Sequence, residues 1–207
     1  MDRRIERVIG EYEARDAREQ GLWRRLSPEE MGERVDEFLL CVGRSTGSLL
    51  NLLAREAGSR SILELGSGYG YATVWLAEAA RASAGRVIGV ELSQEKIDFA
   101  SDALERAGLR EHVELLRGDA RDILSETGEQ YDFVLLDVWK DLYIPCFDAC
   151  LPRLLPGAIV VADNMLEPPQ VAFEALRYRK YVRSLSSVDS VLLPVGSGLH
   201  VARYRTR

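Results

Sequence analysis

The chain has 207 residues, of which 46% are hydrophobic and 29% charged, and its formal net charge is −6. This length and composition predict a soluble globular protein of one domain with a large core. The negative charge argues against a nucleic-acid backbone as the main partner, and no apolar run approaches the roughly 18 residues of a membrane-spanning helix. We therefore expect neither nucleic acid nor a membrane among the partners.

The first 57 residues predict an N-terminal helical cap. Residues 1–20 are charged throughout and lack the apolar core of a signal peptide, so a cytoplasmic location is expected. Apolar side chains keep helical spacing at Ile5, Val8, Ile9 and Tyr12. The segment 27–30 (SPEE) has the capping serine, early proline and acids that begin a helix. A further helix is expected at 46–57, ended by Gly58.

From residue 58 onward, strand-like and helix-like segments alternate. Strands are expected at 61–65, 86–92, 113–119, 131–137, 157–164, 184–193 and 198–204. Helices fill the intervals between the first six strands, which predicts right-handed βαβ units and a mostly parallel sheet with helices on both faces. Only residues 194–197 separate the last two strands, so these should pair as an antiparallel hairpin at one sheet edge.

The chain is therefore expected to form a Rossmann-like, seven-stranded α/β fold. It would be a single domain over residues 1–207, with the cap at 1–57 and the α/β core at 58–207. Ligands of such a sheet bind beyond the carboxyl ends of the strands, so the residues after each strand are candidates for a site. The segment 177–183 (RYRKYVR) is interpreted as a solvated helix face, with a local basic patch as the alternative.

The three cysteines, Cys41, Cys146 and Cys150, are too few for a disulfide framework. Cys146 and Cys150 lie four residues apart on one face of an expected helix, and we interpret them as small buried residues. A metal site would need further ligands, and neither His112 nor His200 is near them in the sequence.

The first strand runs into a glycine-rich turn, ELGSGYG at 64–70. Gly66, Gly68 and Gly70 allow a sharp turn into a helix and a close approach of the backbone to a ligand. The dinucleotide-binding pattern places its third glycine three positions beyond the second, whereas here the interval is two. This spacing argues against a pyrophosphate ligand, and turn geometry without any ligand is the alternative.

Acidic residues follow the next two strands. Glu91, 25 residues beyond Gly66, is placed to accept both hydroxyls of a ribose, and an exposed strand-end acid is the alternative. After the third strand, Asp119 in the segment 118–120 (GDA) is able to hydrogen-bond an adenine amino group.

Asp137, Asp163 and Asn164 lie at the ends of the fourth and fifth expected strands. Because the carboxyl ends of neighbouring parallel strands meet at one edge, we expect these side chains to converge. Two carboxylates and an amide oxygen suit Mg²⁺, whereas two acids without a cation would repel each other. The alternative is that each only caps the helix that follows. Lys140 stands in the first turn of a helix, where the dipole disfavours a cation, and a plain surface lysine is the alternative.

These motifs resemble those of the class I S-adenosylmethionine-dependent methyltransferases, and within them the metal-dependent O-methyltransferases similar to catechol O-methyltransferase. The resemblance covers about residues 35–204 and rests on 42–50 (VGRSTGSLL), 62–73 (ILELGSGYGYAT), 89–92 (GVEL), 118–124 (GDARDIL), 135–143 (LLDVWKDLY) and 160–165 (VVADNM). The last two blocks are highly specific when they occur together.

The resemblance implies a role for each matching residue. S-adenosylmethionine would be bound by the glycine turn and its surroundings, at Val42, Gly66, Gly68, Tyr71, Ala72, Glu91, Leu92, Gly118, Asp119, Ala120, Asp137 and Trp139. Mg²⁺, or another divalent cation such as Mn²⁺ or Ca²⁺, would be held by Asp137, Asp163 and Asn164. Lys140 would be the general base, and Pro168 would form an apolar gate beside an aromatic substrate. The helical cap would cover the pocket and could also mediate a homodimer.

The implied reaction transfers a methyl group from the sulfonium to a hydroxyl of a small, aromatic vicinal diol by in-line displacement. Alignment of donor and acceptor can supply roughly 7–11 kcal/mol. A divalent cation bound to both diol oxygens orients them and lowers the pKa of the hydroxyl, and lysine must lose its proton to act as a base. The alternatives are a metal-independent methyltransferase for another small-molecule acceptor, a nicotinamide-dependent oxidoreductase, and a cofactor-binding module without catalysis.

Four positions depart from the pattern of the catechol enzyme or its relatives. His200 stands where the catechol enzyme has a glutamate that contacts a substrate hydroxyl, and Ser197 replaces an acid beside the tight turn. His200 is interpreted either as a hydroxyl partner or as a structural residue. Val138 alters the wall around the adenine, and Thr46 stands where a lysine occurs in the catechol enzyme. The reaction class is therefore better defined than the substrate.

Overall fold

The computed structural model describes residues 1–23 and 25–205, without the side chains of residues 28, 31 and 32. The strands are β1 (Ser61–Leu65), β2 (Arg86–Glu91), β3 (Val113–Arg117), β4 (Tyr131–Leu136), β5 (Leu154–Ala162), β6 (Val188–Leu193) and β7 (Leu199–Tyr204). The helices are α1 (Arg3–Trp23), α2 (Pro28–Arg34), α3 (Arg44–Glu56), α4 (Tyr71–Ala82), α5 (Gln94–Ala107), α6 (Ala120–Glu126), α7 (Tyr143–Cys150) and α8 (Ala172–Ser184). Short helical turns are η1 (Val35–Glu37), η2 (Arg110–His112), η3 (Lys140–Leu142), η4 (Leu151–Arg153) and η5 (Pro169–Val171).

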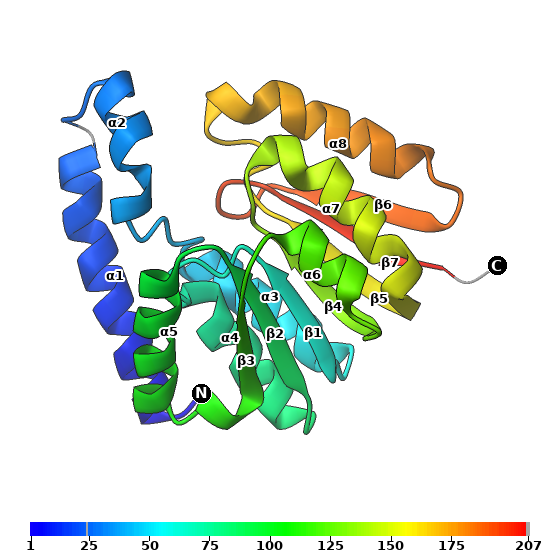
Figure 1. Cartoon of the computed structure of the whole chain (residues 1–207), viewed down its shortest axis with the longest axis horizontal. Helices are drawn as coiled ribbons and strands as arrows, with labels where there is room; N and C mark the ends of the chain where they lie inside the picture. Colours follow the sequence, from blue (N-terminus) through cyan, green and yellow to red (C-terminus); the bar gives the residue numbers. More distant parts are fainter. Residues whose placement is uncertain (24, 206–207) are drawn as a thin grey trace.

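The strands form one sheet in the order β3-β2-β1-β4-β5-β7-β6 (Figure 1). Neighbours among β1 to β5 pair in parallel, whereas β7 runs antiparallel to both β5 and β6. This arrangement confirms the predicted Rossmann-like sheet with a C-terminal antiparallel hairpin. The strand order reverses between β1 and β4, and ligands of such sheets bind beyond the carboxyl ends at this point.

The largest difference between a predicted strand boundary and the structure is at the start of the sixth strand. The strand expected at 184–193 begins only at Val188, because α8 continues to Ser184. Val182 is buried and extends the apolar stripe of α8 beyond Tyr178. Packing of this stripe against the sheet therefore adds a turn to the helix.

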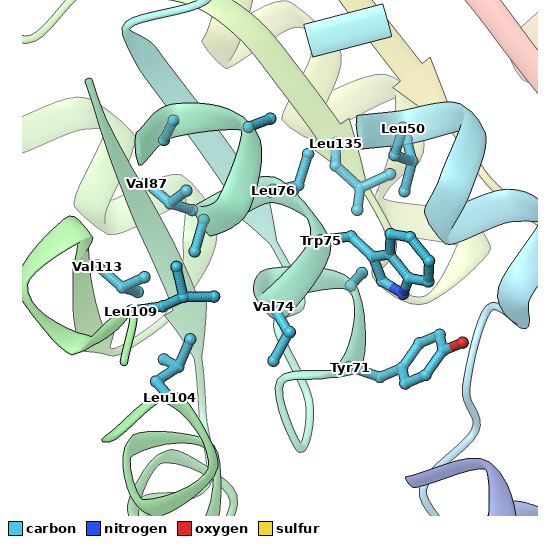
Figure 2. Packing of buried hydrophobic residues seen from close by; sticks show 14 of the residues in the cluster. Leu50, Tyr71, Val74, Trp75, Leu76, Val87, Leu104, Leu109, Val113 and Leu135 are labelled. Atoms are coloured by element: carbon cyan, nitrogen blue, oxygen red, sulfur yellow. The ribbon is translucent and has the colours of Figure 1, made fainter. Parts of the chain in front are cut away.

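Helices cover both faces of the sheet, with α3, α4 and α5 on one face and α6, α7 and α8 on the other (Figure 1). Each face buries its own apolar cluster. Figure 2 shows the first cluster, in which Trp75 of α4 lies near Leu50 of α3. The two helices approach closely, because a Cβ at Gly47 would lie 2.4 Å from Nε1 of Trp75. Cys146 and Cys150 are fully buried in the second cluster, as predicted.

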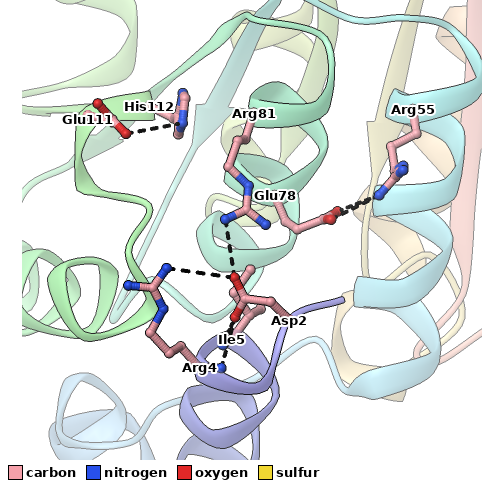
Figure 3. A network of polar contacts seen from close by, with 8 residues as sticks. All are labelled: Asp2, Arg4, Ile5, Arg55, Glu78, Arg81, Glu111 and His112. Atoms are coloured by element: carbon pink, nitrogen blue, oxygen red, sulfur yellow. Dashed lines mark hydrogen bonds and ion pairs between the residues drawn. The ribbon is translucent and has the colours of Figure 1, made fainter.

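The first helix packs on the same core. Its buried side chains are Ile5, Val8, Ile9 and Tyr12. Near its start, Arg81 of α4 donates a hydrogen bond to the carboxylate of Asp2 at 3.3 Å (Figure 3). The hydroxyl of Tyr12 donates to the backbone carbonyl of Tyr69 in the glycine-rich turn. The cap is thus anchored beside that turn, and its division from the core at residue 57 stays a prediction. Among the described residues, no helix is both long and apolar enough to cross a membrane.

Candidate active site

The glycine-rich turn after β1 is held against the ends of β2 and β4. The N–H of Gly66 donates to the carbonyl of Val90 at 3.0 Å. Gly66 has a φ of +86°, and a Cβ there would lie 2.1 Å from the carbonyl oxygen of Asp137. Only glycine therefore allows the turn to contact the end of β4. At Gly68, with a φ of +52°, a Cβ would meet open space, so this part of the turn is accessible.

Glu91 joins the end of β2 to the same turn. One oxygen of its carboxylate accepts from the N–H of Gly68 at 2.9 Å. The other accepts from the N–H groups of Leu92 and Ser93 at 2.8 and 2.9 Å. A carboxylate has about four acceptor positions, so capacity for a ribose hydroxyl is left. Glu91 is thus fixed by backbone donors rather than exposed without partners.

Of the predicted adenine-binding residues, one is already paired with an arginine, whereas two others have exposed apolar side chains. The carboxylate of Asp119 caps α6 by accepting from the N–H of Arg121 at 2.8 Å. The guanidinium of Arg121, 2.9 Å away, lowers the pKa of Asp119 to about 2. This acid therefore already has a capping role, and its contact with adenine stays a prediction. Leu92 and Trp139 are 64% and 60% exposed, and their apolar surface is available to a planar ring.

The other predicted cofactor residues lie in and around α3, α4 and α6. Gly118 and Ala120 flank the capping aspartate of α6, and Val42 precedes α3. Tyr71 and Ala72 are buried in the first turn of α4. The hydroxyl of Tyr71 donates to Glu13 of α1 at 3.0 Å, so the tyrosine side chain belongs to the contact between cap and core.

Asp137 and Asp163 lie at the ends of adjacent parallel strands. The N–H of Asp137 donates to Leu65 of β1, and the N–H of Asp163 donates to Leu136 of β4. Asp163 is 1% exposed, and its Oδ1 has no hydrogen-bond partner within the described part of the chain. Burial, together with the nearby charge of Asp137, raises the pKa of Asp163 to about 7. Burial also raises the pKa of Asp137.

Lys140 points into this cluster. Its Nζ donates to Oδ1 of Asn164 at 2.9 Å and lies 3.7 Å from Oδ1 of Asp137. It also donates to the hydroxyl of Tyr143, which in turn donates to the carbonyl of Asp163 at 3.1 Å. The lysine side chain is only 11% exposed, so it is not a surface lysine. Burial lowers its pKa, an effect that the neighbouring acids oppose.

The donor set fits a hard divalent cation only if the amide takes part. Among residues 1–23 and 25–205, no group of three or more histidine, cysteine, aspartate or glutamate side chains could hold a metal ion. Asp137 and Asp163 therefore need the amide oxygen of Asn164 as a third oxygen ligand. Carboxylate and amide oxygens are what Mg²⁺ prefers, and the buried, unpartnered Oδ1 of Asp163 fits such a role.

One acidic residue near the site was not predicted. Glu64 lies inside the apolar strand β1 and is 1% exposed, and neither carboxylate oxygen has a hydrogen-bond partner among the described residues. Burial raises its pKa to about 8, the nearby hydroxyl of Thr73 opposes this shift, and the charges of Asp137 and Glu91 add to it. The signal in the sequence was a lone acid between apolar strand residues, directly before the glycine-rich turn.

The turn between β6 and β7 was predicted, but its contacts with the rest of the site were not. The backbone carbonyls of Ser197 and Gly198 accept hydrogen bonds, at 2.9 to 3.0 Å, from the loop that follows 163–164. On the opposite side of the turn, a Cβ at Gly196 would lie 2.2 Å from Oγ1 of Thr46 in α3. The turn therefore packs between α3 and the loop that carries the predicted metal ligands. Contacts of this kind have no local signal in the sequence.

His200 is buried inside the sheet and not exposed to solvent. It is fully buried on β7, and its ring packs edge-on against Tyr178 with 5.6 Å between centroids. Burial, with smaller contributions from Arg179 and Arg183, lowers its pKa to about 4, so the imidazole is neutral at pH 7. Both ring nitrogens lack a hydrogen-bond partner among the described residues, so the two interpretations of His200, a hydroxyl partner and a structural residue, both stay predictions.

Comparison with known proteins assigns the family. A family model described as O-methyltransferase matches residues 24–205. The catechol O-methyltransferase of Niastella koreensis is 31% identical over 74% of this chain and 75% of its own length. That of Sus scrofa is 32% identical over 78% of this chain and 96% of its own length.

Solved structures agree with this assignment. An O-methyltransferase from Bacillus cereus in complex with SAH has a TM-score of 0.76 and 27% identity, and the match covers 99% of this chain and 92% of that one. An O-methyltransferase of tomaymycin synthesis from Streptomyces achromogenes, in complex with SAM, has a TM-score of 0.77 and 25% identity. The match covers 100% of this chain and 91% of that one.

The chain belongs to the O-methyltransferase family. The expected class, an S-adenosylmethionine-dependent O-methyltransferase similar to catechol O-methyltransferase, is thereby confirmed, and so is the fold. The family assignment replaces the alternative of a nicotinamide-dependent oxidoreductase. The roles of individual site residues stay predictions.

Proposed function

We propose that this enzyme methylates a hydroxyl of a small aromatic vicinal diol, with a divalent cation held by Asp137, Asp163 and Asn164. Mg²⁺ is the first choice of cation, and Mn²⁺ and Ca²⁺ are alternatives. Support for the acceptor comes from relatives that are named catechol O-methyltransferases. Support for the methyl donor comes from solved relatives in complex with SAM or SAH.

The position of Lys140 is the observation that supports this proposal most directly. Its amino group lies among the polar side chains at the ends of β4 and β5, within hydrogen-bond distance of Asn164 and close to Asp137. The backbone of Asp137 also contacts Gly66 of the glycine-rich turn. The proposed base, the proposed oxygen ligands and the glycine-rich turn thus meet at one edge of the sheet.

In the proposed reaction, the acceptor hydroxyl gives its proton to Nζ of neutral Lys140. The acceptor oxygen attacks the methyl carbon, the O–CH₃ bond forms as the S–CH₃ bond breaks, and the sulfonium becomes the neutral thioether of SAH. Because burial lowers the pKa of Lys140, it loses its own proton more readily than a surface lysine does. A divalent cation, when bound, would orient the two diol oxygens and lower the pKa of the reacting hydroxyl.

The residues around the glycine-rich turn are proposed to hold the methyl donor. Glu91, fixed by three backbone donors, would accept from the ribose hydroxyls. Glu64 is a buried acid without a partner among the described residues, and the cationic amino group of the methionine part would neutralise it. Trp139 would cover the adenine ring with its exposed indole.

A metal-independent methyltransferase for another small-molecule acceptor is the second candidate. The observation that favours it is the ion pair between Lys140 and Asp137, which already places a positive charge beside the carboxylates. The unpartnered oxygen of Asp163 favours the metal-dependent candidate instead. Insensitivity of methyl transfer to EDTA would decide for the second candidate.

The acceptor class is tested with methyl-labelled S-adenosylmethionine, Mg²⁺ and a panel of catechols, each paired with the phenol that lacks one hydroxyl. We expect monomethylated product from at least one catechol and none from its paired phenol. Binding of S-adenosylmethionine is measured in parallel by calorimetry. If the cofactor binds but no catechol is methylated, the proposed acceptor class is wrong.

A further inference from the structure

The amino group of Lys140 occupies a position where a cation would be expected. Nζ is 2.9 Å from Oδ1 of Asn164 and 3.7 Å from Oδ1 of Asp137, and these two residues are proposed metal ligands. Lys140 therefore interacts with the same oxygen atoms that the proposed function assigns to a divalent ion. An ammonium and a divalent cation on the same oxygens would repel each other strongly, because the Lys140 side chain is only 11% exposed and solvent would screen the two charges little.

The remaining contacts of Lys140 do not depend on those oxygens. Nζ also donates to the carbonyl of Val138 at 3.3 Å and to the hydroxyl of Tyr143. Tyr143 is fully buried and is fixed in turn by its hydrogen bond to the carbonyl of Asp163. If the contact with Asn164 were lost, two hydrogen bonds would still keep the amino group beside the cluster.

We propose that Lys140 is a tethered competitor of the divalent cation, and that cation binding releases its amino group from Asn164 and Asp137. The inference rests on the proposed function, since it needs a cation at these ligands. It adds a second role to the base: without the cation, Lys140 provides the positive charge that stabilises the carboxylate pair. The cation would then both complete the ligand set and leave Nζ with Val138 and Tyr143 only.

Cation affinity tests this proposal without any turnover. Mg²⁺ and Mn²⁺ binding is measured by calorimetry, without methyl donor or acceptor, for the wild type and for Lys140→Met. Removal of the competitor is expected to tighten the binding at least tenfold. The matched control is Lys180→Met, which removes an exposed lysine of α8 and should change the affinity less than twofold. Equal or weaker cation binding by Lys140→Met would overturn the proposal.

A second measurement uses the wild-type chain and does not depend on how the variant folds. The sequence contains only three lysines, Lys96, Lys140 and Lys180. With ¹³C at the lysine ε carbons, each gives one NMR signal, which single substitutions at 96 and 180 assign. Addition of Mg²⁺ should shift the signal of Lys140 and leave the other two in place. If the protein binds Mg²⁺ and the Lys140 signal does not move, the proposed competition is wrong but the proposed metal site is not. If the protein binds no cation, both the competition and the metal site are wrong.

Discussion

The folded protein favours the neutral, protonated form of the Glu64 carboxyl group over the ionised form. It lies in β1 with both oxygens unpartnered among the described residues, and burial raises its pKa from 4.5 to about 8. A buried charge of this kind is costly unless a cation is near. The glycine-rich turn that follows is where the cofactor is proposed to bind, so the cost of the acid in the free protein is consistent with a ligand-binding role.

Glu64→Gln should therefore change stability and cofactor binding in opposite directions. The unfolded carboxyl ionises near pH 4.5 and the folded one near pH 8, so the free energy of unfolding of the wild type falls as the pH rises between these values. The variant has no carboxyl group at position 64, so its free energy of unfolding does not fall with pH for this reason. Its midpoint of thermal unfolding should exceed that of the wild type at pH 8.5 by more than at pH 5, while calorimetry shows weaker binding of S-adenosylmethionine. A variant that binds the cofactor as tightly as the wild type would exclude the proposed contact.

Lys140→Met should remove the base without removing the cofactor site. General base catalysis typically contributes about 10²- to 10⁴-fold, so kcat should fall by a factor in this range. The affinity for S-adenosylmethionine should change little, because Lys140 contacts the side chains at the ends of β4 and β5 rather than the glycine-rich turn. Rates are measured with saturating catechol. Lys180→Met serves again as the control, and a Lys140→Met enzyme with wild-type kcat would show that another group takes the proton.

The site residues that could be expected to lie together are those with a local signal in the sequence. Lys140 and Asp163 follow strands that were clear from their apolar runs, and the structure brings them into one cluster. Asp119 had an equally clear position, but its pairing with Arg121 could not be read from a strand-end pattern. Glu64 also had a local signal, a lone acid between apolar strand residues, but the charges of Asp137 and Glu91 that add to its raised pKa come from the ends of other strands and could not be read from that signal.

At the scale of elements, the sheet was predictable and the contacts of its last hairpin were not. Alternation of strands and helices predicts a parallel sheet, and the short link at 194–197 predicts the antiparallel pair. The expected strand at 184–193 starts late because α8 continues to Ser184, and the packing of the hairpin turn depends on α3 and the loop after β5. These partners lie far apart in the sequence, so their contacts follow from the tertiary structure alone.

Gly198→Ala tests the role of the hairpin turn. Gly198 has a φ of +91°, and a Cβ there would lie 2.8 Å from the backbone nitrogen of Leu166. The added methyl should strain the turn and displace the loop that carries Asn164, at a cost of at least about 1 kcal/mol in stability. We expect a lower midpoint of urea unfolding together with weaker Mg²⁺ binding. Gly10→Ala, where a Cβ meets nothing within 4 Å, is the control and should leave both unchanged or raise the stability slightly. Unaltered Mg²⁺ binding in Gly198→Ala would show that the turn does not support the ligands.

At the scale of the whole molecule, α1 shares the core of the α/β sheet. Its buried side chains pack in the same cluster as those of α4, and its first residues reach Arg81 (Figure 3). This packing suggests that cap and core unfold together, although the sequence alone predicted only a helical cap over the pocket. The homodimer and the cytoplasmic location stay predictions.

Ile9→Ala tests whether the cap and the core unfold together. Ile9 is fully buried, and its truncation should lower the free energy of unfolding by roughly 2–5 kcal/mol. Urea unfolding followed by both tryptophan fluorescence and circular dichroism should show one coincident transition, shifted as a whole. Leu22→Ala near the end of the same helix, where the side chain is 53% exposed, should cost less than about 0.5 kcal/mol. A main transition that does not move in Ile9→Ala would mean that the cap unfolds separately.

In the proposed reaction, methyl transfer depends on a divalent ion held by oxygen ligands at the ends of β4 and β5. The most direct measurement is the rate of catechol methylation after EDTA treatment and after Mg²⁺ is restored, for the wild type and for Asp163→Ala. We predict that EDTA abolishes transfer by the wild type, that Mg²⁺ restores it, and that Asp163→Ala stays inactive at any tested Mg²⁺ concentration while binding S-adenosylmethionine. Transfer that continues at an unchanged rate in EDTA, or full activity of Asp163→Ala, would contradict the account.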